Sequence, residues 1–183
     1  MISETVKSKM ADLGAEILNG LANNPRSKLE EMKNELSYSP SPLHKTILLE
    51  WPGTIVFSRG AIFKPAESSP VDPESGFQSL ESLYGLADDQ NNIVIKNRVF
   101  HNQVSDSRYI AIGDAPGGNQ ICVDRETGKV LFWYHEAPDE DNSLFDVAQS
   151  FEEFFKSLQP DEDSRGVESI SGKIDESNSW LDL

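Results

Sequence analysis

The most regular pattern of apolar and polar positions lies between residues 110 and 136. Three short apolar runs are separated there by two turns that contain glycine, at residues 113–118 and 126–129. Glycine adopts positive φ without steric cost, so such clusters are typical of turns between strands. Residues 119–124 alternate with the period of a strand, and residues 130–135 are aliphatic or aromatic except for the last. We therefore expect an antiparallel meander whose last strand is covered on both sides.

Apolar residues at helical spacing predict two helices near the N-terminus. The first is capped by Ser3, ends at residues 23–25 and carries one apolar face: Ile2, Val6, Met10, Leu13, Ile17 and Leu21. The second covers residues 27–36, and a linker follows at residues 38–42. We expect this N-terminal helical segment, residues 1–37, to pack against the rest of the domain. A swapped arm or a dimer element is the alternative.

The middle of the chain has a mixed pattern. The expected elements are, in order, strands within residues 43–65 that include a hairpin at residues 54–63, an irregular loop with three prolines at residues 64–75, a short helix at residues 76–86 and a helix at residues 88–104. For the last of these, a strand at residues 93–95 is the alternative.

A stripe rich in phenylalanine predicts one long helix near the end of the domain, over residues 143–158. Its apolar residues recur three or four positions apart: Leu144, Ala148, Phe151, Phe155 and Leu158. Ser143 is the expected N-cap, and Pro160 follows the C-terminal end. Burying such side chains is worth about 2 kcal/mol each, so this helix must pack on the sheet. Residues 161–183 are mostly polar, and we expect a mobile acidic tail.

Size and charge limit the classes of function. A chain of 183 residues suits one domain of ordinary size, and its net charge is −15. Residues 136–183 hold 14 acidic and 3 basic residues, so the acidity is concentrated near the C-terminus. This charge serves either solubility or the attraction of a basic partner. Direct binding to nucleic acid or to an anionic membrane is disfavoured, because both need basic patches.

Cysteine content and hydropathy indicate the compartment. Cys122 is the only cysteine, so one chain can form neither a disulfide nor a thiolate metal site. No run approaches the roughly 18 apolar residues that a membrane span needs, and the N-terminus lacks the apolar core of a signal peptide. We expect a soluble, cytoplasmic protein.

The sequence contains several partial motifs for chemistry, and each lacks an essential part. His135-Glu136 resembles the start of a zinc protease motif, but residue 139 is aspartate. Gly113 and Gly118 have the spacing of a phosphate loop without its Lys-Ser/Thr pair. Residues 139–143 have the acidic density of a calcium loop without its glycine and its final glutamate. We predict no catalytic residue, no metal site and no cofactor.

Three segments in order resemble one known family: IGDAPGGNQICVD, GKVLFWYHE and VAQSFEEFFKSL. Together they resemble the SUKH superfamily, in the branch related to the yeast Smi/Knr cell-wall assembly regulator. FSRGAIFKP and LESLYGL are similar to a bacterial subset of it, so the resemblance covers residues 51–158. It implies a single SUKH-like α+β domain at residues 43–160, with one twisted, mainly antiparallel sheet and flanking helices.

The resemblance also implies a function that depends on binding. Bacterial relatives are largely immunity proteins that neutralise a cognate polymorphic toxin, often a nuclease or a deaminase. We expect this chain to be a non-catalytic immunity protein with a basic toxin partner; the alternative is a regulatory or scaffold protein without a toxin. The family carries over no binding residue. From charge and position, the candidate contacts are Trp133, Glu136, Asp139, Glu140 and Asp141.

Overall fold

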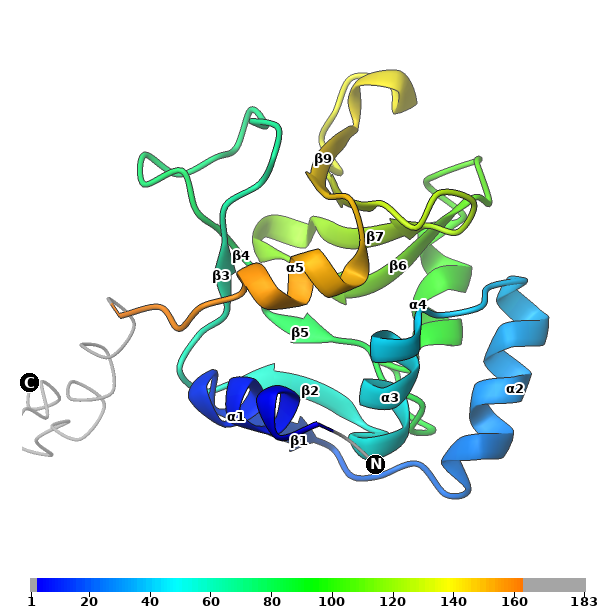
Figure 1. Cartoon of the computed structure of the whole chain (residues 1–183). Coiled ribbons are helices and arrows are strands. Elements are labelled where there is room, and N and C mark those ends of the chain that lie inside the picture. The colour runs from blue at the N-terminus through cyan, green and yellow to red at the C-terminus, as the bar shows by residue number, and fades with distance from the viewer. Residues whose placement is uncertain (1–2, 163–183) are drawn as a thin grey trace, which may run out of the picture.

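Antiparallel strands make up the centre of the molecule (Figure 1). The structure is a computed structural model, and it describes residues 3–162. Seven strands form the main sheet in the order β1-β2-β5-β6-β7-β8-β9, and β3 and β4 form a second, two-stranded sheet. The strands are β1 (Ala15–Leu18), β2 (Thr54–Phe57), β3 (Ile62–Phe63), β4 (Gln78–Ser79), β5 (Ser82–Leu83), β6 (Tyr109–Asp114), β7 (Gln120–Asp124), β8 (Val130–Trp133) and β9 (Leu144–Ala148). The helices are α1 (Glu4–Asp12), α2 (Pro25–Leu36), α3 (Pro42–Glu50), α4 (Ile93–Phe100) and α5 (Phe151–Ser157), with single 3-10 turns η1 (Pro116–Gly118) and η2 (Glu140–Asn142). The predicted α+β domain with one mainly antiparallel sheet is confirmed.

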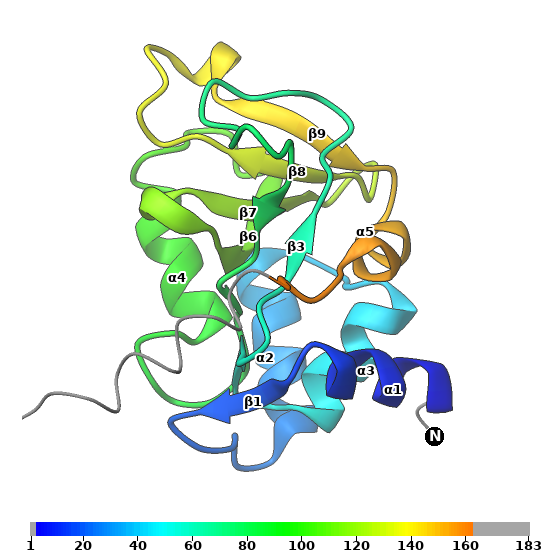
Figure 2. The same cartoon turned by 90° about the vertical axis from the view of Figure 1, so that its left-hand side faces the viewer.

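The helices cover both faces of the main sheet. α4 lies on one side, and α5 and α1 lie on the other (Figure 2). α2 contacts both α3 and α4. The small β3–β4 sheet lies beside α5, where the rings of Phe63 and Phe154 meet edge to face with centroids 5.2 Å apart. Because helices cover both faces, the central strands are apolar on both sides and buried.

The predicted meander is confirmed as β6, β7 and β8. Ile121 lies opposite Phe132 and Cys122 opposite Leu131, so consecutive residues of β7 bury side chains on opposite faces. All four residues of β8 are buried, as the expectation of a doubly covered strand requires. Gly128 has φ +78° at the β7–β8 turn, a value that glycine adopts without strain.

The predicted first helix is correct only in its first part. Ser3 caps α1 as expected, accepting a hydrogen bond from the Val6 amide, but the helix ends at Asp12. Gly14 turns the chain at φ +64°, and β1 then pairs antiparallel with β2. The spacing of Ile17 and Leu21 is compatible with a strand followed by a loop as well as with a helix. Pairing with β2 satisfies the backbone hydrogen bonds of β1, so a longer helix is not needed for this.

Three expectations for the middle of the chain are wrong. Residues 43–50 belong to α3, where Pro42 occupies the first turn and Ser41 accepts a hydrogen bond from the His44 amide. Residues 54–57 and 62–63 are strands as expected, but they do not form a hairpin, because β2 pairs with β1 and β5 while β3 pairs with β4. Residues 76–86 hold β4 and β5 instead of a short helix. For residues 54–57 and 82–83, pairing with strands distant in sequence decides the local conformation.

The long helix predicted for residues 143–158 is also wrong in its first half. Residues 144–148 form β9, which pairs with β8, and α5 begins only at Phe151. The cap is Ser150, whose side chain accepts a hydrogen bond from the Glu153 amide at 3.1 Å.

Other expectations are confirmed. α2 covers the helix predicted at residues 27–36, α4 lies within the one predicted at residues 88–104, and residues 64–75 form an irregular loop. Between residues 3 and 162, no helix has the length and apolar character that crossing a membrane requires. The expected acidic tail lies, from residue 163 on, outside the described residues.

Candidate partner-binding surface

The connection between β8 and β9, residues 134–143, carries four of the five predicted contact residues. It leaves the sheet directly after Trp133. The indole of Trp133 is only 4% exposed and meets the ring of Phe100 edge to face, with centroids 5.1 Å apart. Trp133 therefore lies beneath the connection and joins it to α4, whereas the acidic residues that follow lie at the surface.

Asp139 holds the connection in shape. One carboxylate oxygen accepts hydrogen bonds from the amide and the side-chain nitrogen of Asn142, at 3.0 and 2.7 Å. Ser143 is buried and donates from its hydroxyl to the carbonyl of Glu140 at 2.8 Å. These contacts form the single turn of η2. The side chain of Asp139 thus fixes the conformation that presents its neighbours.

Glu140 fastens the connection to a second segment of the chain. Its two carboxylate oxygens accept hydrogen bonds from the amide and the hydroxyl of Ser105, both at 2.6 Å. The same two hydrogen bonds hold the pKa of the Glu140 carboxyl below its usual range. The loop before β6 and the β8–β9 connection therefore form one continuous surface.

Two predicted residues have side chains that point into solvent. The carboxyl of Glu136 is 67% exposed; one oxygen accepts a hydrogen bond from the hydroxyl of Tyr134 at 3.3 Å. Asp141 is exposed at the tip of η2 and borders a hollow of about 390 Å³ that Asp106 and Arg108 also line. These carboxylates are available to a partner without first breaking a strong contact.

The loop before β6 adds charged residues that sequence reasoning missed. Arg108 lies within 3.9 Å of three carboxylates, those of Asp106, Asp124 and Glu126, and over the ring of Tyr109. Its charge is thus neutralised within the chain, and the surface stays acidic. The polar run Ser-Asp-Ser-Arg at residues 105–108 was the available signal, because it directly precedes a strand.

His135 marks the other side of the connection. Its backbone amide and its Nδ1 both lie 3.1 Å from the side-chain oxygen of Asn119, which is buried beside η1. Its Nε2 lies 4.0 Å from Glu136. Nowhere in residues 3–162 do three or more histidine, cysteine, aspartate or glutamate side chains gather as they would around a metal ion. His135 therefore helps to hold the start of the connection against the segment around η1.

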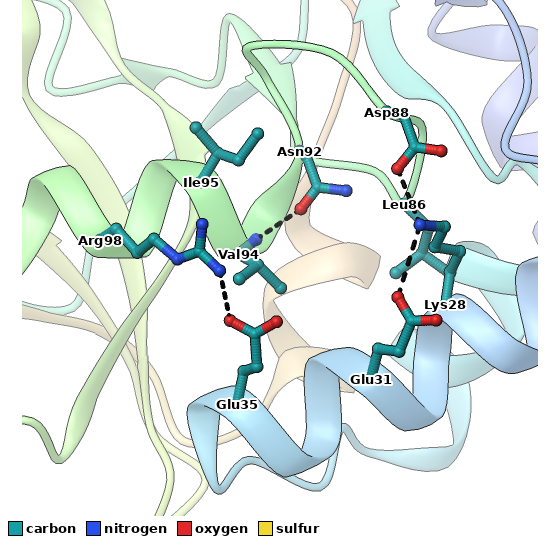
Figure 3. Close-up of a pocket in the computed structure, with 9 residues that line it drawn as sticks. All are labelled: Lys28, Glu31, Glu35, Leu86, Asp88, Asn92, Val94, Ile95 and Arg98. Carbon is teal, nitrogen blue, oxygen red and sulfur yellow. Dashed lines mark hydrogen bonds and ion pairs between the residues drawn. The ribbon is translucent and has the colours of Figure 1, made fainter.

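A second candidate surface lies between α2 and α4 (Figure 3). Here ion pairs surround an apolar strip in a hollow of about 180 Å³. Arg98 of α4 contacts Glu35 of α2 at 2.6 Å, and Lys28 contacts Asp88 at 2.8 Å. The side chain of Ile95 is 40% exposed at this hollow. Both cations are already paired, so the hollow suits contact with a protein better than the binding of an anion.

Comparison with known proteins identifies the family of this chain. Residues 27–157 match the SMI1 / KNR4 family (SUKH-1). The chain is also similar to the SPbeta prophage-derived uncharacterized protein YokK of Bacillus subtilis (strain 168). The two are 31% identical over 144 residues, which cover 74% of each chain. With its seven-stranded antiparallel sheet, covering helices and this match over most of its length, the chain belongs to the SMI1/KNR4 family (SUKH-1).

Proposed function

We propose that this protein is a non-catalytic immunity protein, which binds and neutralises a cognate toxin domain of nuclease or deaminase type. Membership of the SMI1/KNR4 family carries the proposal, because immunity proteins are frequent among its bacterial members. The acidic surface built by Ser105, Glu140 and their neighbours supports it. A toxin that acts on nucleic acid needs a basic groove, and an acidic protein surface competes for that groove.

The proposed contact surface consists of the exposed carboxylates of the β8–β9 connection and the loop before β6. Glu136 and Asp141 contact the toxin, together with Asp106. Asp139 and Glu140 act mainly by holding these residues in place, since their own carboxylates are hydrogen-bonded within the chain. Trp133 supports the connection from below.

Co-expression tests the proposal. The gene beside the one for this chain is examined for a secreted protein with a toxic C-terminal domain, and that domain is expressed with and without this chain. Immunity predicts that cells survive only with the chain and that the two proteins co-purify. If cells die equally in both cases and no complex forms, the immunity function is wrong.

Charge reversal tests the proposed surface. Glu136→Lys and Asp141→Lys are each expected to weaken the complex roughly tenfold, because each replaces an attraction with a repulsion. Glu50→Lys is the matched control. Glu50 is exposed at the end of α3, so its substitution makes the same charge change at a different part of the surface. If Glu50→Lys weakens the complex as much as the other two substitutions do, the affinity depends on net charge alone, and the β8–β9 connection is not the contact site.

A regulatory or scaffold role without a toxin is the other candidate. The α2–α4 hollow, with its exposed Ile95 and its rim of ion pairs, is the feature that favours it. In that case no toxin gene adjoins this one, and the chain binds a cellular protein through a surface that Ile95→Lys disrupts while Glu136→Lys does not.

A further inference from the structure

β4 has one edge that pairs with no strand among residues 3–162. On the other side of the small sheet, Ile62 exchanges both backbone hydrogen bonds with Gln159, each at 2.9 Å. In an antiparallel pair, a residue that bonds on one side faces its opposite neighbour without bonding to it. Ile62 lies opposite Ser79, so the N–H and C=O of Ser79 point away from β3. In the part of the chain that the structure describes, neither group has a hydrogen-bond partner.

A hollow lies along this open edge. It has a volume of about 260 Å³, and its opposite wall is formed by η1 and residues 134–136. Val71, Pro73 and Tyr134 give it apolar sides. A second hollow of about 480 Å³ continues over the outer face of the small sheet, past Phe77. The two hollows share Pro73 and Ser79, so they meet at the open edge and together have the form of a slot.

The chain covers the comparable edge elsewhere. On the outer side of β9, the amides of Ala66 and Glu67 donate to the carbonyls of Val147 and Asp146, at 3.2 and 2.9 Å. A carboxylate oxygen of Glu67 accepts a further hydrogen bond from the Asp146 amide. An unpaired edge is a template for another strand. At β9 these hydrogen bonds occupy the edge, so a further strand cannot pair there. The same long loop that closes β9 leaves β4 open, beside a hollow.

The charge of the slot selects its occupant. Among residues 3–162, no lysine or arginine lines either hollow, whereas Glu136 lines the hollow along the open edge. A partner segment with lysine or arginine is therefore favoured by charge.

We propose that an extended, basic segment of the partner protein binds in this slot and adds to β4 as a further strand. The inference rests on the proposed function in taking that partner to be a protein. The backbone of the bound segment forms hydrogen bonds with the N–H and C=O of Ser79, which gives affinity. Alternate side chains of the segment enter the apolar hollows, which gives specificity. Glu136 then pairs with a basic side chain at the end of the slot, so the slot adjoins the acidic surface described above.

A pair of substitutions at Ser79 tests the proposal in the full chain. Ser79→Pro removes the outward N–H, which the fold does not use, and proline is tolerated on such an edge. Ser79→Ala removes the hydroxyl and keeps the N–H. The probe is a short peptide of alternating lysine and valine with blocked ends, and its glutamate–valine counterpart is the control. We expect the basic peptide to bind, to shift the Ser79 amide resonance and to slow its hydrogen exchange. Its affinity is expected to be about tenfold lower for Ser79→Pro and unchanged for Ser79→Ala.

Three outcomes would contradict binding in the slot. They are equal affinity of Ser79→Pro and Ser79→Ala for the basic peptide, equally tight binding of the acidic peptide, and resonance shifts confined to residues 139–141. Slow exchange of the Ser79 amide in the free chain would show that another part of this chain already fills the slot. The peptide experiment does not depend on a toxin. If Ser79→Pro rescues cells as well as the unaltered chain does, the proposed strand addition to β4 is wrong and the immunity function stands. If the unaltered chain fails to rescue cells, the immunity function is wrong, and the peptide experiment still tests strand addition by itself.

Discussion

At the scale of single residues, His44 shows how a titratable group can serve structure alone. Its ring is 1% exposed and stacks on Phe151, with centroids 4.4 Å apart. Its Nδ1 lies 3.0 Å from the hydroxyl of Tyr38. Burial lowers the pKa of His44 from 6.5 to about 4, and the nearby charge of Glu152 opposes this only in part. The imidazole is therefore neutral at physiological pH and ties α3 to α5.

This burial predicts acid sensitivity. Between pH 6.5 and 4 the unfolded chain binds a proton at His44 that the folded chain does not, so stability falls as the pH is lowered through this range. The full loss attributable to His44 is about 3 kcal/mol. Urea unfolding from pH 7 to pH 4 measures it. His44→Gln should flatten this part of the pH dependence, whereas Tyr38→Phe should keep it because the histidine remains. An unchanged dependence in His44→Gln would contradict the assignment.

Asn97 is a buried polar residue that completes the main sheet. Its side chain donates to the carbonyls of Ile93 and Ala111 and accepts from the amide of Ala111, each at 2.8 Å. β5 extends along β6 only as far as Leu83, which lies opposite Gly113, so Ala111 has no strand partner on that side. The amide group of Asn97 takes the place of the missing strand.

Removing that amide group should be costly. Asn97→Leu leaves a buried N–H and a buried C=O of Ala111 unpaired, and we expect a loss of roughly 3 kcal/mol in the free energy of unfolding. Urea titration at pH 7 measures it. Asn102→Leu is the control, since Asn102 is exposed just beyond the same helix and should change stability by less than about 0.5 kcal/mol. Equal losses in the two variants would rule out this role for Asn97.

At the scale of elements, the boundary between β9 and α5 shows why periodicity was misleading. Apolar residues three and four positions apart continue from Leu144 to Leu158, as in a single helix. Residues 144–148 nevertheless pair with β8, because the last strand of the meander needs a neighbour for its backbone groups. Ser150 then begins α5 with its own N-cap, and the spacing Ser150-x-x-Glu153 was the local signal for that start.

The N-cap supplies a prediction for α5. Ser150→Ala removes the acceptor for the Glu153 amide and should lower the free energy of unfolding by about 1 kcal/mol. Ser150→Asp keeps an acceptor at the same position and should restore most of the stability. Thermal or urea unfolding of both variants provides the comparison. A loss in Ser150→Asp as large as in Ser150→Ala would show that the cap contributes little.

At the scale of the whole molecule, the net charge of −15 governs encounters with a partner. Exposed charges are screened beyond about 8 Å at physiological salt, so steering by an acidic surface weakens as salt is added. If the β8–β9 connection steers a basic toxin, raising the salt from low to high concentration should slow association roughly tenfold or more and change dissociation less. Stopped-flow association of the purified pair measures this. An association rate that is flat across that range would leave solubility as the role of the acidic residues.

The exposed acidic residues of the candidate surface could be predicted from sequence, but not the contacts that hold them in place. The acidity of residues 136–141 was evident, and Glu136 and Asp141 are exposed as a contact surface needs. The burial of Trp133 against Phe100 and the link from Glu140 to Ser105 join residues more than 30 positions apart. Local patterns carry no information about such pairs.

The sequence by itself determined the central meander, the helices α2 and α4, the acidic character and the family resemblance. Each of these depends on short-range pattern: alternation, helical spacing, glycine turns or composition. Tertiary structure decided the strands β1, β4, β5 and β9, the placement of Asn97 and the open edge of β4. The physical reason is that a strand needs a partner to satisfy its backbone hydrogen bonds, and the partner is chosen among segments far apart in the chain.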